Sequence, residues 1–335
     1  MHQTLQRTLL YDWHVKHGAN MAPFGEYEMP LWYPAGAKEE HMSVITRAGL
    51  FDTSHMAVIT AAGPGTRDLL QRCFSKDLQR CAGKDKAPLT PGKCIYGVFL
   101  NRMGEVLDDA IVYQCAIDQY MIVVNSGQGR EILQHLEAHK EMLRADLTDL
   151  SGQIGKLDVQ GPLSAKILKK LIIKPDQVFA NMPYFSFKGY FDETSESVNQ
   201  ARLLDQTPLL LSRTGYTGEF GFEIFVRPEY FKKTWELIID SGKEMGLIPC
   251  GLAARDSLKA ASEASVSLPS PLSAARAFEK FGWSRSAPPA PSTISTAPAA
   301  PTRRSGTRAS ASLATASVTS TSPSVSVLRT IPPCS

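Results

Sequence analysis

The composition of the chain changes abruptly near residue 260, and this change limits the part that can fold around a core. Residues 9–259 mix apolar segments with charged residues of both signs. Residues 260–335 consist mainly of Ala, Ser, Pro, Thr and Arg, and Glu263 and Glu279 are their acidic residues. Such a segment buries too little apolar surface to offset the entropy of ordering it. We therefore expect a folded region that ends near residue 259 and a disordered tail.

Charge and hydrophobicity exclude several classes of protein. The 36 Lys and Arg residues nearly balance the 33 Asp and Glu residues, so charge does not indicate a nucleic-acid partner. Residues 1–15 lack the apolar core of a signal peptide, and no run reaches the length of about 20 apolar residues that a membrane helix needs. We expect a protein of the cytoplasm with no membrane association.

The six cysteines are scattered and do not form a C-x-x-C pair, so neither a zinc site nor a redox dithiol is expected. Free cysteine packs as a small hydrophobic residue. Buried thiols are therefore predicted for most of this set: Cys73, Cys81, Cys94, Cys115, Cys250 and Cys334.

Three short runs of β-branched, apolar and aromatic residues follow one another in the first half of the chain. They are Lys93 to Leu100, Val106 to Tyr113 and Tyr120 to Asn125, and turn residues separate them at Asn101 to Gly104 and at Ala116 to Gln119. This spacing predicts a β-meander, in which consecutive strands pair through hairpins.

Apolar residues at spacings of three and four predict amphipathic helices over Gln128 to Leu143, Pro162 to Ile172 and Tyr230 to Met245. Hairpin strands that helices then cover indicate an α+β fold with antiparallel or mixed sheets. We expect an N-terminal α+β region over 1–150 and a second α+β region over 151–259.

Asp108 and Asp109 begin the predicted strand Val106 to Tyr113. Neighbouring residues of a strand face opposite sides, so one carboxylate can point into a cavity while the other faces solvent or caps the backbone. Burial raises the pKa of a carboxyl group, which suits a group that receives or holds a proton. Simple capping of the turn is the alternative interpretation.

Two glycine-containing segments follow later in the chain. Ser212 to Glu223 holds three glycines, and its Tyr216 and Glu223 offer an aromatic face and a carboxylate to a heteroaromatic ligand; a plain hairpin is the alternative. Gly251 to Lys259 leads into a predicted helix with Arg255 in its first turns. Arg255 can bind a carboxylate near a pocket, or pair on the surface with Asp256 or Glu219.

His135 and His139 lie one helical turn apart, a spacing that can bind a metal ion, but no third ligand is evident in the sequence. A solvated helix face is the favoured interpretation, and we predict no metal site. Gly127 and Gly129 lack the third glycine and the βαβ context of a dinucleotide-binding loop.

Taken in order, seven segments resemble the aminomethyltransferase family, the T-protein of the glycine cleavage system. They are Leu10 to His14, Phe51 to Met56, Gly92 to Tyr96, Leu107 to Asp109, Val159 to Pro162, Ser212 to Glu223 and Gly251 to Leu258. The resemblance covers residues 9 to about 260. It implies a folate-binding fold around a central cavity, followed in the family by a C-terminal barrel-like domain.

The resemblance also implies roles for individual residues. Asp109 is the expected catalytic carboxylate, which hydrogen-bonds the reactive nitrogens of the folate. The residues expected to bind folate and substrate are Met56, Tyr96, Asp108, Asn125, Tyr216, Glu223 and Arg255.

The activity that the resemblance implies transfers the methylene carbon of the aminomethyl-lipoyl group of H-protein to tetrahydrofolate, with release of ammonia. The implied partners are tetrahydrofolate, as acceptor substrate, and lipoylated H-protein, without a metal or a redox cofactor. We expect a monomer.

The tail over 260–335 does not match the family, so the barrel domain is expected to be absent or scrambled. Our hypothesis is that the tail is an out-of-frame product of a GC-rich gene. Two other functions remain open, a folate-dependent demethylase and a non-catalytic folate-binding protein of the same fold. The Lys-Gly-Cys-Tyr-x-Gly-Gln-Glu signature of folate-binding assembly and repair factors is absent from Ser212 to Glu223.

Overall fold

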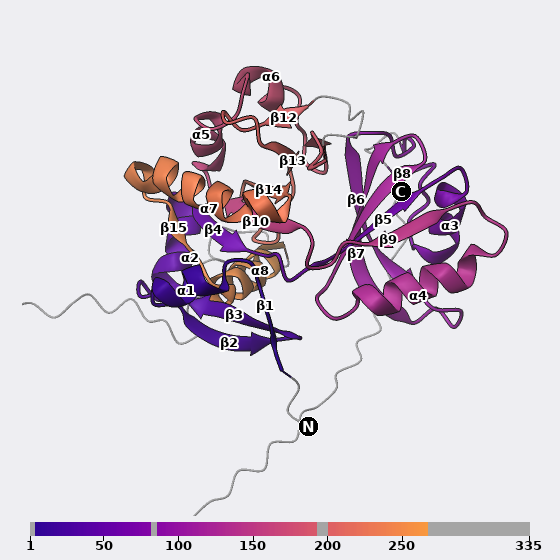
Figure 1. Cartoon of the computed structure of the whole chain (residues 1–335), viewed down its shortest axis with the longest axis horizontal. Helices are drawn as coiled ribbons and strands as arrows, with labels where there is room; N and C mark the ends of the chain where they lie inside the picture. The colour runs from indigo at the N-terminus through magenta and orange to yellow at the C-terminus, as the bar shows by residue number, and fades with distance from the viewer. Residues whose placement is uncertain (1–3, 82–85, 193–199, 267–335) are drawn as a thin grey trace, which may run out of the picture. The chain divides into compact units, whose positions relative to one another are not determined.

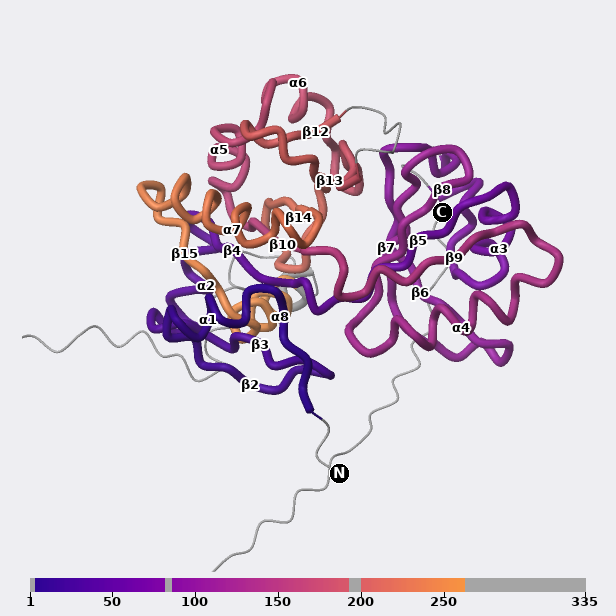
Figure 2. Tube along the Cα trace, in the orientation of Figure 1, coloured from indigo at the N-terminus to yellow at the C-terminus, as the bar shows by residue number. Residues whose placement is uncertain are grey.

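The computed structural model describes residues 4–81, 86–192 and 200–266 (Figures 1 and 2). In this part of the chain the strands form three sheets, with helices packed on them. The predicted α+β class, with antiparallel and mixed sheets, is confirmed. Apart from residues 260–266, the predicted tail lies outside the described residues. The expectation that the barrel domain is absent or scrambled falls on those same residues outside the description.

The N-terminal sheet is small. Its strand order is β1-β3-β2, with β1 parallel and β2 antiparallel to β3. The elements of this region are β1 (Gln6–Arg7), α1 (Tyr11–Lys16), β2 (Asn20–Phe24), β3 (Tyr27–Trp32) and α2 (Ala37–Thr46).

A five-stranded antiparallel sheet contains the predicted meander. Its order is β6-β7-β8-β5-β9. The strands are β5 (Ala57–Ala62), β6 (Lys93–Leu100), β7 (Val106–Ala116), β8 (Gln119–Val124) and β9 (Asp146–Asp149). The turn after β6 is stabilised by Asn101, whose Oδ1 accepts the backbone N–H groups of Met103 and Glu105 at 2.9 and 3.0 Å. Two helices, α3 (Thr66–Cys73) and α4 (Gly129–Lys140), cover one face of this sheet.

A seven-stranded mixed sheet follows the order β11-β13-β14-β10-β4-β15, and β12 pairs with β13. Its strands are β4 (Gly49–Asp52), β10 (Gly155–Gln160), β11 (Phe187–Lys188), β12 (Ala201–Arg202), β13 (Pro208–Ser212), β14 (Gly221–Val226) and β15 (Ile248–Pro249). The pairing of β15 with β4 is parallel, and the other pairings in this sheet are antiparallel. The remaining elements are α5 (Ser164–Lys169), α6 (Pro175–Phe179), α7 (Pro228–Gly242), a 3-10 turn η1 (Lys243–Met245) and α8 (Leu252–Val266).

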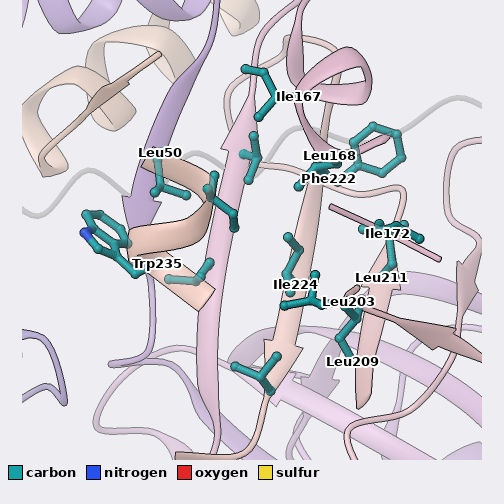
Figure 3. Close-up of a cluster of buried hydrophobic side chains, with 14 of the residues drawn as sticks. Leu50, Ile167, Leu168, Ile172, Leu203, Leu209, Leu211, Phe222, Ile224 and Trp235 are labelled. Atoms are coloured by element: carbon teal, nitrogen blue, oxygen red, sulfur yellow. The ribbon is translucent and has the colours of Figure 1, made fainter. Parts of the chain in front are cut away.

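The period-two alternation of β10 and β14 divides their side chains between two environments. Leu157 and Val159 of β10, with Phe222 and Ile224 of β14, pack against α5 and α7 in an apolar core (Figure 3). The opposite face carries Lys156, Asp158 and Gln160 on β10 and Glu223 and Phe225 on β14, all buried. This second face therefore holds the buried polar groups of β10 and β14.

A further apolar cluster joins the two larger sheets on the faces that these helices leave uncovered. It combines Val58, Tyr113 and Met121 of the five-stranded sheet with Leu210 and Phe225 of the seven-stranded sheet. The order of layers is thus helices, sheet, sheet, helices, and the space between the sheets is where their inward-facing polar residues meet.

The predicted helices all exist, but their ends differ from the prediction. The helix expected to reach Leu143 ends at Lys140, where Glu141 adopts a positive φ of 49°. The helix expected to reach Ile172 ends at Lys169, and Ile172 instead pairs with Leu203 in an isolated bridge. Both ends depend on contacts or backbone conformations that apolar periodicity does not encode.

The seven-stranded sheet includes strands from both predicted regions. Residue 150 lies between β9 and β10, yet β4, from the region 1–150, pairs with β10 from the region 151–259. Helix α8 continues past residue 259 to Val266. Among the described residues, no helix has the length and apolar character needed to cross a membrane.

Of the cysteines, Cys73, Cys94, Cys115 and Cys250 are buried free thiols, as predicted, and Cys81 is partly exposed. Cys334 lies outside the described residues.

Candidate functional site

A cavity of about 360 Å³ contains most of the residues that the sequence singled out. Seven of the eight candidates line it: Met56, Tyr96, Asp109, Asn125, Tyr216, Glu223 and Arg255. The other lining residues are Ala110, Ile111, Val123, Lys156, Tyr184, Phe185, Thr214, Gly215, Gly218, Lys259 and Ser262. Strands β6, β7 and β8, strands β10 and β14, and helix α8 all contribute side chains, so the cavity is built from segments that are far apart in the sequence.

Asp108 and Asp109 point to different surroundings, as the alternation of a strand requires. Asp109 lines the cavity, whereas Asp108 is not among the described residues that line it. Asp108 accepts the backbone N–H of Asn125 at 2.8 Å and its side-chain amide at 2.8 Å, so it ties β7 to the end of β8. Burial raises the pKa of Asp108. Asp108 therefore caps a backbone N–H at the end of β8 and not the turn after β6, and the cavity interpretation holds for Asp109.

Two donors fix the carboxylate of Asp109. The phenol of Tyr96 donates to Oδ2 at 2.9 Å, and the side-chain amide of Asn125 donates to Oδ1 at 2.5 Å. Burial, and then the hydrogen bond to Asp109, raise the pKa of Tyr96 to about 12. Tyr96 therefore remains a protonated donor at neutral pH and holds Asp109 in one orientation.

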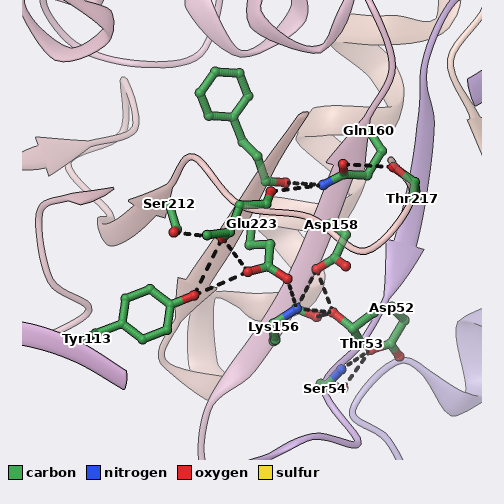
Figure 4. Close-up of polar contacts among 12 residues, drawn as sticks. Asp52, Thr53, Ser54, Tyr113, Lys156, Asp158, Gln160, Ser212, Thr217 and Glu223 are labelled. Atoms are coloured by element: carbon green, nitrogen blue, oxygen red, sulfur yellow. Dashed lines mark hydrogen bonds and ion pairs between the residues drawn. The ribbon is translucent and has the colours of Figure 1, made fainter. Parts of the chain in front are cut away.

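Glu223 is anchored in a buried polar network behind the cavity (Figure 4). Its Oε1 accepts from the ammonium of Lys156 at 2.7 Å, and its Oε2 accepts from the hydroxyls of Thr214 at 2.5 Å and Tyr113 at 3.2 Å. Burial alone would raise the pKa of Glu223, but the charge of Lys156 and these hydrogen bonds outweigh it and hold the pKa below its usual value. Glu223 is therefore a carboxylate in the folded protein.

Lys156 is the centre of this network. Its ammonium also contacts Asp158 Oδ1 at 2.6 Å and Thr53 Oγ1 at 3.0 Å. Burial lowers the pKa of Lys156, but the negative charges of Asp158 and Glu223 raise it by more than burial lowers it. The pKa of Lys156 is therefore above its usual value. The cavity thus has a permanent positive charge beneath the carboxylate of Glu223.

Gln160 positions the loop between β13 and β14. Its amide nitrogen donates to the backbone oxygens of Thr214 and Phe222 at 3.3 Å each, and its Oε1 accepts from Thr217 at 3.1 Å. A Cβ on Gly215 or Gly221 would lie 2.2 or 2.3 Å from Gln160 Oε1. A larger residue at either position would therefore have to displace the side chain of Gln160, which bonds the loop that carries Tyr216 and the start of β14.

Arg255 and Lys259 lie one turn apart on α8 and flank Tyr216. The guanidinium of Arg255 lies 4.1 Å from the centre of the Tyr216 ring, the ammonium of Lys259 lies 4.3 Å from it, and Lys259 also donates to the phenol oxygen of Tyr216. Arg255 is only 8% exposed, so the alternative of a surface ion pair is wrong. Its buried Nε has no hydrogen-bond partner among the described residues.

Several residues of the site were missed by sequence analysis, and Lys156, Thr214 and Lys259 are the main ones. Lys156 alternates with apolar residues along β10, and that pattern is ordinarily the signature of a solvent-exposed strand face. Thr214 and Lys259 lie inside the two glycine-containing segments that the sequence analysis named. Their position in those segments was the available signal for a role in the site. Their partners come from other strands, which local patterns do not reveal.

Comparisons with known proteins identify the family of this chain. The family model of the GCVT N-terminal domain matches residues 10–266. An aminomethyltransferase of Symbiobacterium thermophilum is 36% identical over 262 residues, which cover 77% of this chain and 64% of the relative. An aminomethyltransferase of Anoxybacillus flavithermus is 36% identical over 255 residues, 76% of this chain and 64% of that protein.

A solved structure shares the fold of this chain. The crystal structure of glycine cleavage system aminomethyltransferase T from Bartonella henselae superimposes with a TM-score of 0.63 at 29% identity, over 77% of this chain and 63% of that one. The chain thus spans slightly less than two thirds of the length of these relatives. Because the family model matches well over half of the chain, this protein belongs to the GCVT N-terminal domain family.

Proposed function

We propose that this chain carries the folate-binding and catalytic part of a tetrahydrofolate-dependent aminomethyltransferase. The observation that supports this most directly is that seven candidate residues, drawn from six separate segments, line one cavity. The names of the relatives support the same class of reaction.

The residues of the cavity fit a reduced pterin. Its volume of about 360 Å³ lies in the range of small-molecule sites. Asp109 and Glu223 offer carboxylate oxygens to a ring system rich in N–H donors, and charge-assisted hydrogen bonds of this kind are the stronger ones. Tyr96 and Tyr216 offer flat aromatic surfaces to a planar ring.

The unpartnered Nε of Arg255 also supports a bound ligand. A buried donor without a partner costs free energy, so an acceptor is expected at that position in the working protein. Either an acceptor on the folate or a polar group of the donor substrate would satisfy it.

The proposed reaction transfers one carbon between two bound groups. Two N–H groups of tetrahydrofolate give two new N–C bonds to the methylene carbon, and the C–S and C–N bonds of the aminomethyl-lipoyl group break. One proton goes to the departing nitrogen, which leaves as ammonia, and one goes to the sulfur, which leaves as a thiol. The products are 5,10-methylenetetrahydrofolate, ammonia and the dihydrolipoyl arm of H-protein.

Asp109 is the group that we propose acts on the reacting nitrogens. Tyr96 and Asn125 already hold its carboxylate in place, and Asp109 lines the cavity. A fixed carboxylate can orient the folate and stabilise positive charge that develops on a nitrogen during attack. Glu223, held anionic by Lys156, is proposed to bind the pterin from the opposite wall.

The activity is tested with the full chain, aminomethyl-loaded H-protein and tetrahydrofolate, by measuring ammonia and 5,10-methylenetetrahydrofolate. We expect turnover by the wild type and a fall of about a hundredfold or more in kcat for Asp109→Asn. Asp118→Asn is the matched control, since Asp118 lies in the β7–β8 turn and is not among the described residues that line the cavity. A wild type that binds tetrahydrofolate but transfers nothing from H-protein would contradict the proposed donor.

A parallel assay with sarcosine and dimethylglycine as donors separates the proposal from a folate-dependent demethylase. Methyl transfer from these small amines to tetrahydrofolate, which yields 5-methyltetrahydrofolate and the demethylated amine, with no methylene transfer from H-protein, would favour the demethylase. Tetrahydrofolate binding without transfer from any donor would favour a binding protein of the same fold.

A further inference from the structure

We propose that Cys73, His135 and His139 form a zinc-binding site on the helical face of the five-stranded sheet, independent of the folate cavity. The ligand atoms of these three side chains all lie within 4.8 Å of one another. His135 and His139 are one turn apart on α4, and Cys73 is the last residue of α3. The structure thus supplies the third ligand that the sequence around the two histidines does not show.

The two helices hold these residues together without a metal. Leu69 and Leu70 of α3 and Ile132 and Leu136 of α4 are fully buried in the same apolar core as Cys73. Beyond the site, Arg72 forms an ion pair with Glu141 at 2.9 Å. The backbone that carries the three ligands is therefore fixed by packing, as a preorganised site requires.

Hydrogen bonds select the tautomer of His139 that a metal requires. Its Nδ1 lies 2.8 Å from the backbone oxygen of His135, which can only accept, so Nδ1 carries the proton. The guanidinium of Arg102, which can only donate, lies 3.5 Å from Nε2. Nε2 therefore keeps a lone pair, and a ring N–H donated to a backbone carbonyl is the usual arrangement behind a metal-binding histidine.

His135 has a buried nitrogen without a partner. Its Nε2 makes no hydrogen bond among the described residues, although the atom is shielded from solvent. The two imidazole rings lie 4.4 Å apart between centres and are tilted by 47°. A buried polar atom without a partner calls for an explanation, and a metal ion at this position provides one.

The ligand set identifies the metal class. One thiolate and two imidazoles are typical of Zn²⁺, which binds sulfur at about 2.3 Å and nitrogen at about 2.0 to 2.1 Å in tetrahedral geometry. Two nitrogens on one zinc ion are then roughly 3.4 Å apart. Closing the site from within 4.8 Å needs side-chain movements of about 1 Å, and it leaves a fourth position for water.

The metal would be a structural ion that cross-links α3 and α4, and it would take no part in the transfer reaction. Arg102 is its competitor, because its guanidinium must leave Nε2 of His139 when the metal binds. Arg102 is exposed on the β6–β7 turn, so this displacement needs no rearrangement of the core.

Isothermal titration with Zn²⁺, on the full chain without an affinity tag, tests the site. We expect one zinc ion per chain, affinity at least about tenfold weaker in Cys73→Ser and in His139→Gln, and tighter binding in Arg102→Ala. The matched controls are Cys81→Ser and His17→Gln, which change the same residue types outside the cluster. Wild-type binding that is no tighter than that of the three-ligand variant Cys73→Ser/His135→Gln/His139→Gln would overturn the proposal.

Cobalt replaces zinc as a spectroscopic probe. We expect Co²⁺ to give a sulfur-to-metal charge-transfer band that is lost in Cys73→Ser and retained in Cys81→Ser. Melting with Zn²⁺ at about one hundred times Kd is expected to raise Tm by about 5 °C for the wild type and not for His139→Gln, and EDTA should reverse the rise. A folded Cys73→Ser variant with the same cobalt spectrum as the wild type would exclude a thiolate ligand from Cys73 and contradict the proposed site.

Discussion

Lys156 is a buried cation that contacts Glu223 in the candidate active site. It is 3% exposed and contacts Asp158 and Glu223 at 2.6 and 2.7 Å, so its removal leaves two buried acidic groups without their cation. Removing one partner of a buried ion pair costs about 3–5 kcal/mol. The balance of this network therefore depends on one side chain.

We predict that Lys156→Met lowers the free energy of unfolding by about 3–5 kcal/mol and weakens ligand binding through Glu223. Lys169→Met is the control, because the ion pair of Lys169 with Asp176 is exposed and contributes about 0–1 kcal/mol. Urea denaturation of both variants measures the difference. Equal, small losses would show that the buried charge of Lys156 is not needed to balance Glu223 and Asp158.

His55 gives the protein a specific sensitivity to acid. It is buried beside the rings of Phe24 and Tyr27, and burial, followed by the charge of Arg255, lowers its pKa to about 3. In the unfolded chain a histidine titrates near pH 6.5, so between about pH 6.5 and 3 the unfolded state binds a proton that the folded state does not. Stability from neutral His55 is complete above that window and is lost as the pH falls through it.

Between about pH 5.5 and pH 4.5 we predict that the wild type loses roughly 1.4 kcal/mol more stability than His55→Gln. Urea denaturation at several pH values measures the two slopes. The exposed His17 supplies the control His17→Gln, which should keep the wild-type slope. Parallel pH profiles for the wild type and His55→Gln would mean that His55 takes up its proton in the folded protein.

At the scale of elements, the loop between β13 and β14 and the strand β10 form one unit through Gln160. A methyl group on Gly221 would lie 2.3 Å from Gln160 Oε1, closer than two such atoms can approach. Overpacking of this kind costs about 1–3 kcal/mol. The loop that carries Tyr216, and the start of β14 that leads to Glu223, should therefore respond to changes in Gln160.

We predict that Gly221→Ala destabilises the protein by about 1–3 kcal/mol, and that adding Gln160→Ala recovers part of this loss. A double-mutant cycle from denaturation measurements gives the coupling energy. Strictly additive effects would show that the Gln160 side chain is not the reason for glycine at this position.

Elements that pair with their neighbours in the chain could be predicted from the sequence. Strands β6, β7 and β8 pair with their neighbours in the chain through short turns, so alternation and turn residues were sufficient. Strand β10 pairs with β4 and β14, far away in the sequence, and the burial of its polar face arises only from those contacts. The cavity residues were found through the family resemblance, whereas Lys156 and the pairing of Cys73 with the two histidines required the fold.

At the scale of the whole molecule, described residues of both larger sheets and of α8 line the candidate cavity. The two larger sheets meet across a shared apolar cluster, and α8 supplies Arg255 and Lys259. The chain spans slightly less than two thirds of the length of its relatives. The proposed function therefore requires that this part of the chain binds tetrahydrofolate by itself.

Tetrahydrofolate binding, measured by calorimetry under reducing conditions, tests this claim most directly. We expect the full chain to bind tetrahydrofolate, with affinity about tenfold to a hundredfold weaker in Asp109→Asn, where a hydrogen bond to a charged group is lost, and unchanged in Asp118→Asn. A folded wild type that does not bind tetrahydrofolate, or an Asp109→Asn variant that binds it as tightly as the wild type, would contradict the account.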